Sequence, residues 1–186
     1  MAGWRKGEMQ LSIGQKVAYP NQGVCMVEGV QQKRIGGDAI DFYSLRVLND
    51  NSIIFVPTCN AETVGIRPVI TSLQCKKLIN RLSADFEDIS CDWKSRSKEF
   101  MDQLRSGDVF QAADVLKKLT FLSHEKKLSF REQNLLEKSK FLIISEITNA
   151  NAADEDALRE EIERLVETAC RKHIRTQPKV LAATVH

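Results

Sequence analysis

The chain has 186 residues, of which 42% are hydrophobic and 28% charged, and its formal net charge at pH 7 is only +2. This length and hydrophobic content suffice for two small domains, each with a core of its own. A net charge so close to zero excludes a protein coated uniformly with cations, so any contact with a nucleic acid must come from a local patch.

The start of the chain and its cysteines point to a cytoplasmic protein. Residues 1–8 contain cations but no apolar run follows them, so the sequence predicts neither a signal peptide nor a membrane span there, but a disordered extension. The five cysteines are odd in number and widely spaced, without a C-x-x-C pair and without a histidine at the spacing that a zinc site would use. We therefore expect reduced cysteines and no metal or other cofactor.

Residues 9–70 contain short runs of β-branched and aromatic residues, which favour strands. Turn-forming clusters of Gly, Pro, Asn and Asp separate these runs at residues 20–23, 34–38 and 49–51. Strands are predicted at residues 16–19, 24–30, 42–48 and 52–57, and a fifth could form at 64–67. Short strands at this spacing predict a small curled sheet or barrel.

From Thr71 onward the hydrophobic period lengthens from two residues to about three and a half, which predicts helices. Thr71 or Ser72 can cap the first helix. Its core-facing residues are predicted to be Leu73, Leu78, Ile79 and Leu82. Residues 83–90 are acidic and less regular. The first helix and this connector together account for residues 71–90.

The rest of the chain continues as helices. Trp93 begins a helix that ends at the Ser-Gly-Asp break of residues 106–108, and Asp108 can cap the next one. Ser129 and Glu132 match a capping box, which predicts a long helix ending near Asn149.

A last helix is predicted at residues 154–172, because its acidic residues come early and its cations late, as the helix dipole favours. Residues 174–186 are predicted to be a disordered tail. The predicted fold class is therefore α+β, with a β domain over residues 9–70 and an all-helical domain over 71–173.

The start of the predicted second helix, residues 91–98, reads Cys-Asp-Trp-Lys-Ser-Arg-Ser-Lys. Cations beside a large flat ring suit a nucleic acid, because the cations can meet phosphates while Trp93 packs against or between bases. The octet equally fits a helix-start tryptophan buried in a core, with solvated cations around it. Between residues 93 and 140 there are eleven Lys and Arg residues and seven Asp and Glu residues. A solvated helix surface would also show this excess of positive charge.

Five short motifs occur in order along the chain. They are GQKVAYPNQGV at 14–24, IFVP at 54–57 followed by Asn60-Ala61, DWKSR at 92–96, LRSGD at 104–108, and KLS at 127–129 leading to LEKSK at 136–140. In this order they resemble the CarD family of bacterial transcription regulators. The resemblance runs in register from about Met9 to Asn149.

The resemblance implies a specific function. Members of the family have an N-terminal Tudor-like barrel that binds the β subunit of RNA polymerase, and a helical domain that contacts promoter DNA. A tryptophan of the helical domain wedges into the minor groove at the upstream edge of the melted region and stabilises the open complex. The resemblance thus implies a monomeric regulator, cytoplasmic and associated with the nucleoid through RNA polymerase, that binds DNA with little sequence specificity and binds no membrane.

The resemblance also assigns candidate site residues. Trp93 stands at the position of the wedge, and two positions that are often basic are Ser95 and Gln133 here. DNA contacts are therefore expected from Trp93, Lys94, Arg96, Lys98, Lys138 and Lys140.

The polymerase contact is expected on the barrel, at an exposed strand edge. Lys33 aligns with a basic polymerase-facing residue, whereas Phe55 stands where some members carry arginine. The contact residues are expected to be Lys33, Arg34, Ile53, Phe55 and Pro57. Simple core packing of Phe55 is an equal alternative.

Two other classes of function compete with this one. An enzyme would need convergent catalytic groups, yet the three histidines, His124, His173 and His186, lie near a helix end or in the tail, and no cysteine has the surroundings of a nucleophile. No catalytic residue is predicted. The closer rival is a protein-interaction module whose barrel binds polymerase or another partner without direct DNA contact, with Trp93 buried.

Overall fold

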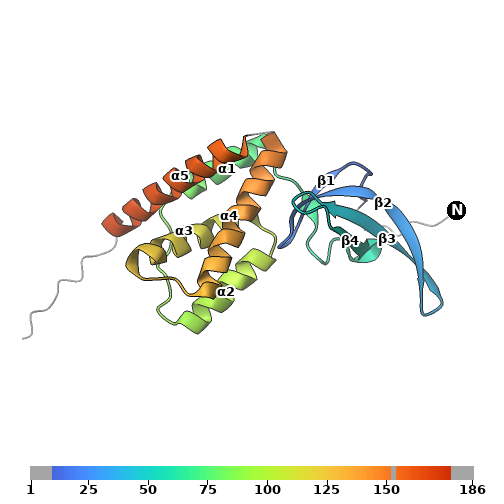
Figure 1. Cartoon of the computed structure of the whole chain (residues 1–186), viewed down its shortest axis with the longest axis horizontal. Helices are drawn as coiled ribbons and strands as arrows, with labels where there is room; N and C mark the ends of the chain where they lie inside the picture. Colours follow the sequence, from blue (N-terminus) through green and yellow to red (C-terminus); the bar gives the residue numbers. More distant parts are fainter. Residues whose placement is uncertain (1–9, 152–153, 177–186) are drawn as a thin grey trace, which may run out of the picture.

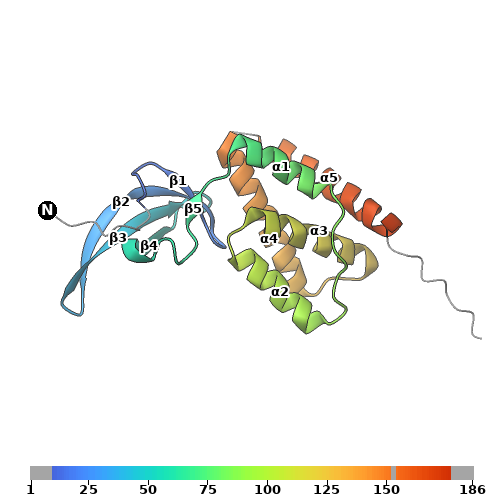
Figure 2. The ribbon, with the colours of Figure 1, turned by 180° about the vertical axis from the view of Figure 1, so that it is seen from behind.

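A computed structural model of the chain describes residues 10–151 and 154–176, apart from the side chain of Trp93. A curled β-sheet lies at one end of the molecule and a bundle of helices at the other, as Figures 1 and 2 show from opposite sides. The predicted α+β class is confirmed. The expected extension at residues 1–8, and the expected tail from residue 177 onward, lie outside the described ranges.

Five antiparallel strands form the β domain: β1 Lys16–Tyr19, β2 Gly23–Ile35, β3 Asp38–Val47, β4 Ile53–Pro57 and β5 Arg67–Pro68. They pair in the order β4-β3-β2-β1-β5, which makes β4 and β5 the two edges of the sheet. A bulge in β2 between Val27 and Gly29 helps the sheet to curl. A one-turn 3-10 helix, Thr58–Asn60, follows β4.

The hairpin of β2 and β3 is longer than the sequence predicted. Gly36 and Gly37 both have positive φ, 62° and 97°, so two residues suffice for the turn and the strands continue to Ile35 and Asp38. Side chains of β2 beyond Gly29 are exposed, so this end of the hairpin projects from the domain. The core of the β domain lies nearer the other end of the hairpin, around Val17, Cys25, Leu45, Val47, Val56 and Ile66.

Five helices form the second domain: α1 Ser72–Leu82, α2 Trp93–Arg105, α3 Val109–Glu125, α4 Phe130–Asn151 and α5 Glu155–Thr176. The predicted caps are confirmed: Thr71 forms a capping box with Gln74, and Asp108 accepts a hydrogen bond from the Phe110 amide at 2.8 Å. The predicted Ser129–Glu132 box is also present. Local sequence therefore fixes where most of these helices begin.

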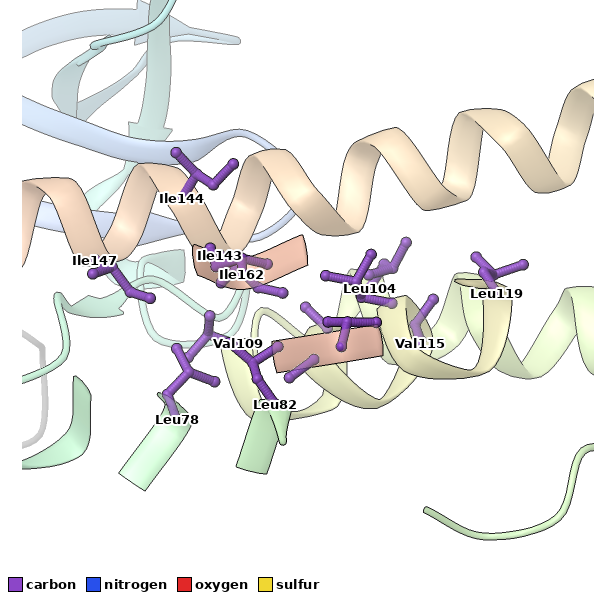
Figure 3. Packing of buried hydrophobic residues seen from close by; sticks show 14 of the residues in the cluster. Leu78, Leu82, Leu104, Val109, Val115, Leu119, Ile143, Ile144, Ile147 and Ile162 are labelled. Atoms are coloured by element: carbon purple, nitrogen blue, oxygen red, sulfur yellow. The ribbon is translucent and has the colours of Figure 1, made fainter. Parts of the chain in front are cut away.

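The helical core is shared by all five helices, and α3 contacts each of the other four. Figure 3 shows side chains from the different helices meeting in it, among them Leu78, Leu104, Leu119, Ile147 and Ile162. Within the described ranges, no helix is both long enough and apolar enough to cross a membrane.

Two predictions in this domain are wrong. Leu73 was expected in the core but is 65% exposed, because capping at Thr71 places it on the outer side of the first turn, and Cys75 takes the inward position. The tail was expected to be disordered from residue 174, but α5 continues to Thr176. The extra turn is held by His173, which is buried against the connector 83–92.

The two domains meet at a polar joint. Arg67 of β5 forms a two-pronged ion pair with the buried carboxylate of Glu146 in α4, and its guanidinium also donates to the Gly107 carbonyl at 2.7 and 3.0 Å. The Ile70 amide donates to the same carboxylate at 3.1 Å. Because removing either charge would leave the other group without its partner, this joint favours one arrangement of the two domains.

Close backbone packing completes the joint. Gly65 and Gly107 both have positive φ, and a Cβ at either would lie 3.0 Å or less from the ring of Pro20. On the other side, the Val24 amide donates to the Ser145 hydroxyl at 3.2 Å. The turn after β1, the segment before β5 and the break before α3 thus fit together without room for side chains.

Candidate nucleic-acid and polymerase interfaces

The backbone at the start of α2 is fixed by its own cap. The Asp92 carboxylate accepts hydrogen bonds from the Lys94 amide at 3.3 Å and the Ser95 amide at 3.0 Å. Trp93 is therefore the first residue of α2, at the position that the sequence predicted. Its side chain lies outside the described part of the structure, so the exposure of its ring stays a prediction.

Arg96 holds α2 to α4. Its side chain is only 7% exposed, and it donates to the Glu132 carboxylate at 3.1 Å and to the Ser90 carbonyl at 2.7 Å. The resemblance to the CarD family predicts that this guanidinium approaches a DNA phosphate, but its donors are occupied by protein partners. We therefore assign Arg96 to positioning the first turn of α2.

Glu132 is the centre of this brace, which consists of Arg96, Lys126, Ser129 and Glu132. Its carboxylate accepts hydrogen bonds from the amide and hydroxyl of Ser129, at 2.9 and 2.8 Å, and from Lys126 at 3.1 Å. Burial alone would raise the pKa of Glu132, but these bonds and the one from Arg96 outweigh it and lower the pKa to about 2. The carboxylate is thus charged at all physiological pH values, and it ties the starts of α2 and α4 together.

The brace presents a mixed cationic and apolar surface, which we call the α2–α4 surface: Lys94, Lys98, Phe130 and Arg131. Lys94 and Lys98 are exposed and lie four residues apart on one side of α2. Phe130 is 79% exposed on the first turn of α4, and Arg131 donates to the Met101 sulfur of α2 at 3.0 Å. Phe130 was not among the predicted site residues, although a residue directly after a capping serine occupies a first-turn position that commonly points outward.

Lys138 and Lys140, expected to bind DNA, have other surroundings. The Lys138 ammonium lies 5.3 Å from the centre of the Phe141 ring, and burial lowers its pKa, against the opposing effect of Asp50 in the β3–β4 loop. The Lys140 ammonium pairs with Glu163 of α5 at 3.1 Å. The structure therefore does not bring these two lysines into the α2–α4 surface.

The expected polymerase contact lies on the β4 edge, which we define as Lys33, Ile53 and Phe55. Ile53 is 46% and Phe55 40% exposed, so the alternative of core packing for Phe55 is excluded. The Lys33 ammonium lies 3.5 Å from the centre of the Phe55 ring, a cation–π contact across β3. Arg34 is exposed nearby on β2, and Pro57 is half-buried at the end of β4.

The cysteines divide by exposure: Cys25, Cys75 and Cys170 are buried, whereas Cys59 and Cys91 are exposed. All five are unpaired, and burial raises the pKa of Cys25 and of Cys170 to about 11. Within residues 10–151 and 154–176, no three His, Cys, Asp or Glu side chains are arranged to hold a metal ion.

Both domains of the chain match known protein families. Residues 11–70 match the family described as the CarD-like/TRCF RID domain, and residues 77–163 match the CarD C-terminal domain. The chain belongs to the CarD family. The β4 edge lies in the first matched region and the α2–α4 surface in the second, whereas the last part of α5 lies beyond both.

Relatives of this CarD-family protein agree with the assignment. It is 27% identical over 135 residues to the Bacillus subtilis (strain 168) protein YdeB, which is named as a candidate transcription factor, and the match covers 73% of this chain and 88% of YdeB. The solution structure of the N-terminal domain of Myxococcus xanthus CarD is 33% identical, over 36% of this chain and 93% of that domain, with a TM-score of 0.28. At that TM-score the superposition supports no conclusion about this chain. The family is one of transcription factors and not of enzymes.

Proposed function

We propose that this CarD-family protein binds the β subunit of RNA polymerase through the β4 edge and stabilises the open promoter complex with the start of α2. The observation that carries the proposal is the brace around Glu132. It fixes the helix turn that begins with Trp93, beside exposed Lys94, Lys98 and Phe130. The domain that carries the β4 edge matches the CarD-like/TRCF RID family, which supports polymerase as its partner.

The first step is docking of the β domain. An edge strand offers backbone N–H and C=O groups for pairing with a strand of the partner. The half-exposed ring of Phe55 supplies an apolar anchor. The Lys33 ammonium lies over one face of this ring, so the charged side chain is already held in place before the partner binds. This contact would recruit the protein to promoters, so that the chain needs no operator sequence of its own.

The second step is contact of α2 with DNA at the edge of the melted region. Wedging a ring between base pairs costs a few kcal/mol in intact duplex and less where the bases are already unstacked at a fork. A ring placed there opposes closure of the bubble. Lys94 and Lys98, exposed on the same turns, are suited to meeting the flanking phosphates.

The polar joint connects the two steps. With Arg67 tied to Glu146 and Gly107, docking of the β domain would also place α2 on the DNA. The joint thus reduces the conformational entropy that the complex would otherwise lose on assembly.

Site-specific photo-crosslinking in the polymerase–promoter complex tests the proposal. A crosslinking residue in place of Phe55 is expected to capture the β subunit, and one in place of Lys98 to capture DNA at the upstream edge of the bubble. Position 161, an exposed glutamate on α5, is the control and should capture neither. Capture of protein alone by position 98 would instead support an interaction module without DNA contact.

A further inference from the structure

The connector between α1 and α2, residues 83–92, leads directly to Trp93 and contains neither helix nor strand. Figure 2 shows it passing along the helical domain between the end of α1 and the start of α2. At its far end it is held by Arg96, which binds the Ser90 carbonyl. Its near end is held by the last two turns of α5.

The main contact of α5 is the ring of His173, which is 2% exposed. It stacks on Phe86 of the connector, with centroids 4.1 Å apart and planes 17° apart, and meets the edge of Phe121 of α3 at 5.0 Å. The Nδ1 atom lies 3.0 Å from the Asp85 carboxylate, and Nε2 lies 3.7 Å from that of Asp88. A histidine between two acidic side chains and an aromatic ring thus fixes three residues of the connector.

Two further side chains of α5 bind the same segment. The Thr176 hydroxyl donates to Asp85 at 2.7 Å, and the Lys172 ammonium donates to the Ser83 carbonyl at 2.7 Å. The Thr176 bond, with smaller contributions from the Phe86 amide and His173, lowers the pKa of Asp85 although partial burial opposes this. Lys172, His173 and Thr176 all lie beyond residue 163, where the match to the CarD C-terminal domain ends.

Lys117 of α3 closes the contact from the other side. Its ammonium is buried and donates to the carbonyls of Arg81 and Ala84, at 2.9 and 3.3 Å, while lying 5.7 Å from the centre of the Phe86 ring. The start of the connector is thus enclosed between α3 and α5.

We propose that the last two turns of α5 act as a clamp, made of Lys172, His173 and Thr176, that positions the connector and thereby orients Trp93 for DNA. The proposal rests on the function proposed above. A loop held at both ends loses less entropy when Trp93 engages the bubble, so a loosened clamp would weaken that engagement without touching the DNA or polymerase contacts themselves. His173 is in this sense a positioning residue.

The test uses the full chain with Trp4→Phe, so that Trp93 is the sole tryptophan. His173→Asn keeps an N–H near Nδ1 but loses the stacking, His173→Phe keeps the stacking but loses the bond to Asp85, and Thr176→Val loses one bond at an exposed site. Arg164→Ala, an exposed change elsewhere on α5, is the matched control. Hydrogen exchange of amides 84–95, the anisotropy decay of Trp93, polymerase binding and open-complex lifetime are measured on each.

We expect His173→Phe and Thr176→Val, each of which loses one hydrogen bond to Asp85, to speed exchange across residues 84–95 by roughly five- to tenfold. Trp93 should become more mobile, the open-complex lifetime should shorten several-fold, and polymerase binding should stay unchanged. In a Trp93→Ala background the same changes should shorten the lifetime no further. Connector exchange as slow in His173→Phe as in the native chain, with faster exchange in His173→Asn, would show that the stacking on Phe86 alone holds the connector.

The proposal is overturned if connector exchange and Trp93 mobility match those of Arg164→Ala in every variant, or if the lifetime loss persists in full in the Trp93→Ala background. If Trp93→Ala left the open-complex lifetime unchanged, the proposed DNA function would be refuted. Exchange and anisotropy would still decide whether the clamp exists, so the two failures are distinguishable.

Discussion

The β4 edge and the α2–α4 surface both expose an aromatic side chain beside cations, but they are supported in different ways. Phe55 lies on a regular strand, and the lysine that covers its ring comes from the same sheet. The start of α2 depends on Glu132, 36 residues away from Arg96, and on a connector held by the end of α5. A surface on a sheet edge is thus maintained by local pairing, whereas one at a helix start needs distant residues to hold it in place. Mutations far from the contact should therefore affect the second surface and spare the first.

The largest effect is expected from Glu132→Ala. It removes half of the α4 capping box and leaves the buried guanidinium of Arg96 without its carboxylate partner, which costs about 3–5 kcal/mol of unfolding free energy. Denaturant unfolding measures this loss, and Glu137→Ala, at an exposed site of the same helix, should change the unfolding free energy by less than about 0.5 kcal/mol. Equal effects of the two substitutions would show that the brace is not a structural centre.

The Glu132 carboxylate also makes the stability of the protein depend on pH. The pKa of Glu132 falls from its ordinary 4.5 to about 2 in the folded protein. The contribution of the Glu132 carboxylate to the free energy of unfolding is therefore complete above about pH 4.5 and is lost as the pH falls towards 2. The shift corresponds to about 3 kcal/mol. Glu132→Gln should flatten the stability profile of the protein between these pH values. An unchanged slope in Glu132→Gln would assign the acid sensitivity to other groups.

The polar joint between the two domains is expected to contribute about 2–3 kcal/mol to the free energy of unfolding. Arg67→Ala leaves the buried carboxylate of Glu146 without its main partner, so the domains should separate more easily. Small-angle scattering should show a broader distribution of interdomain distances, and denaturation should begin at a lower denaturant concentration. Arg105→Ala, at an exposed arginine, is the control. A variant whose scattering curve matches the native one would show that packing at Pro20 suffices for the joint.

A smaller and more selective effect is expected at the β4 edge. Phe55→Ala should weaken polymerase binding by about 1–2 kcal/mol and Phe55→Arg or Lys33→Glu should weaken it as well, with little change in stability because the ring is 40% exposed. Binding of core polymerase is the measurement. Leu73→Ala, at an exposed apolar residue of α1, should leave the affinity unchanged.

The smallest effects are expected from single lysines. Lys98→Ala should lower DNA affinity in the polymerase complex and reduce the slope of its salt dependence by about one. Lys140→Ala should do neither, because its ammonium is paired with Glu163. If Lys140→Ala had the larger effect, the DNA path would run along α4 and not across the start of α2.

Features held by residues close together in the chain were predictable from the sequence, and features held by distant residues were not. Helix starts at Thr71, Asp108 and Ser129 were predictable because a cap involves residues within one turn. The burial of Arg96 was not, because its partner comes from another helix. The continuation of α5 past residue 173 was missed for the same reason, since the contacts of that last turn with the connector join residues almost ninety positions apart.

The candidate site residues also differ in whether the sequence alone could place them. The exposure of Phe55 on an edge strand was one of two alternatives until the strand order was known. Lys138 and Lys140 lie on an amphipathic helix whose sides could be assigned only once α5 and the β domain were in place beside it. Phe130 could have been found from its position directly after the capping serine.

The most direct test of the central claim is the lifetime of the open promoter complex with Trp93→Ala. We expect a lifetime shortened by about tenfold or more, together with unchanged polymerase binding, because only the DNA wedge is removed. A normal lifetime, with Trp93→Ala protein bound to polymerase at the native affinity, would show that Trp93 does not hold the bubble open.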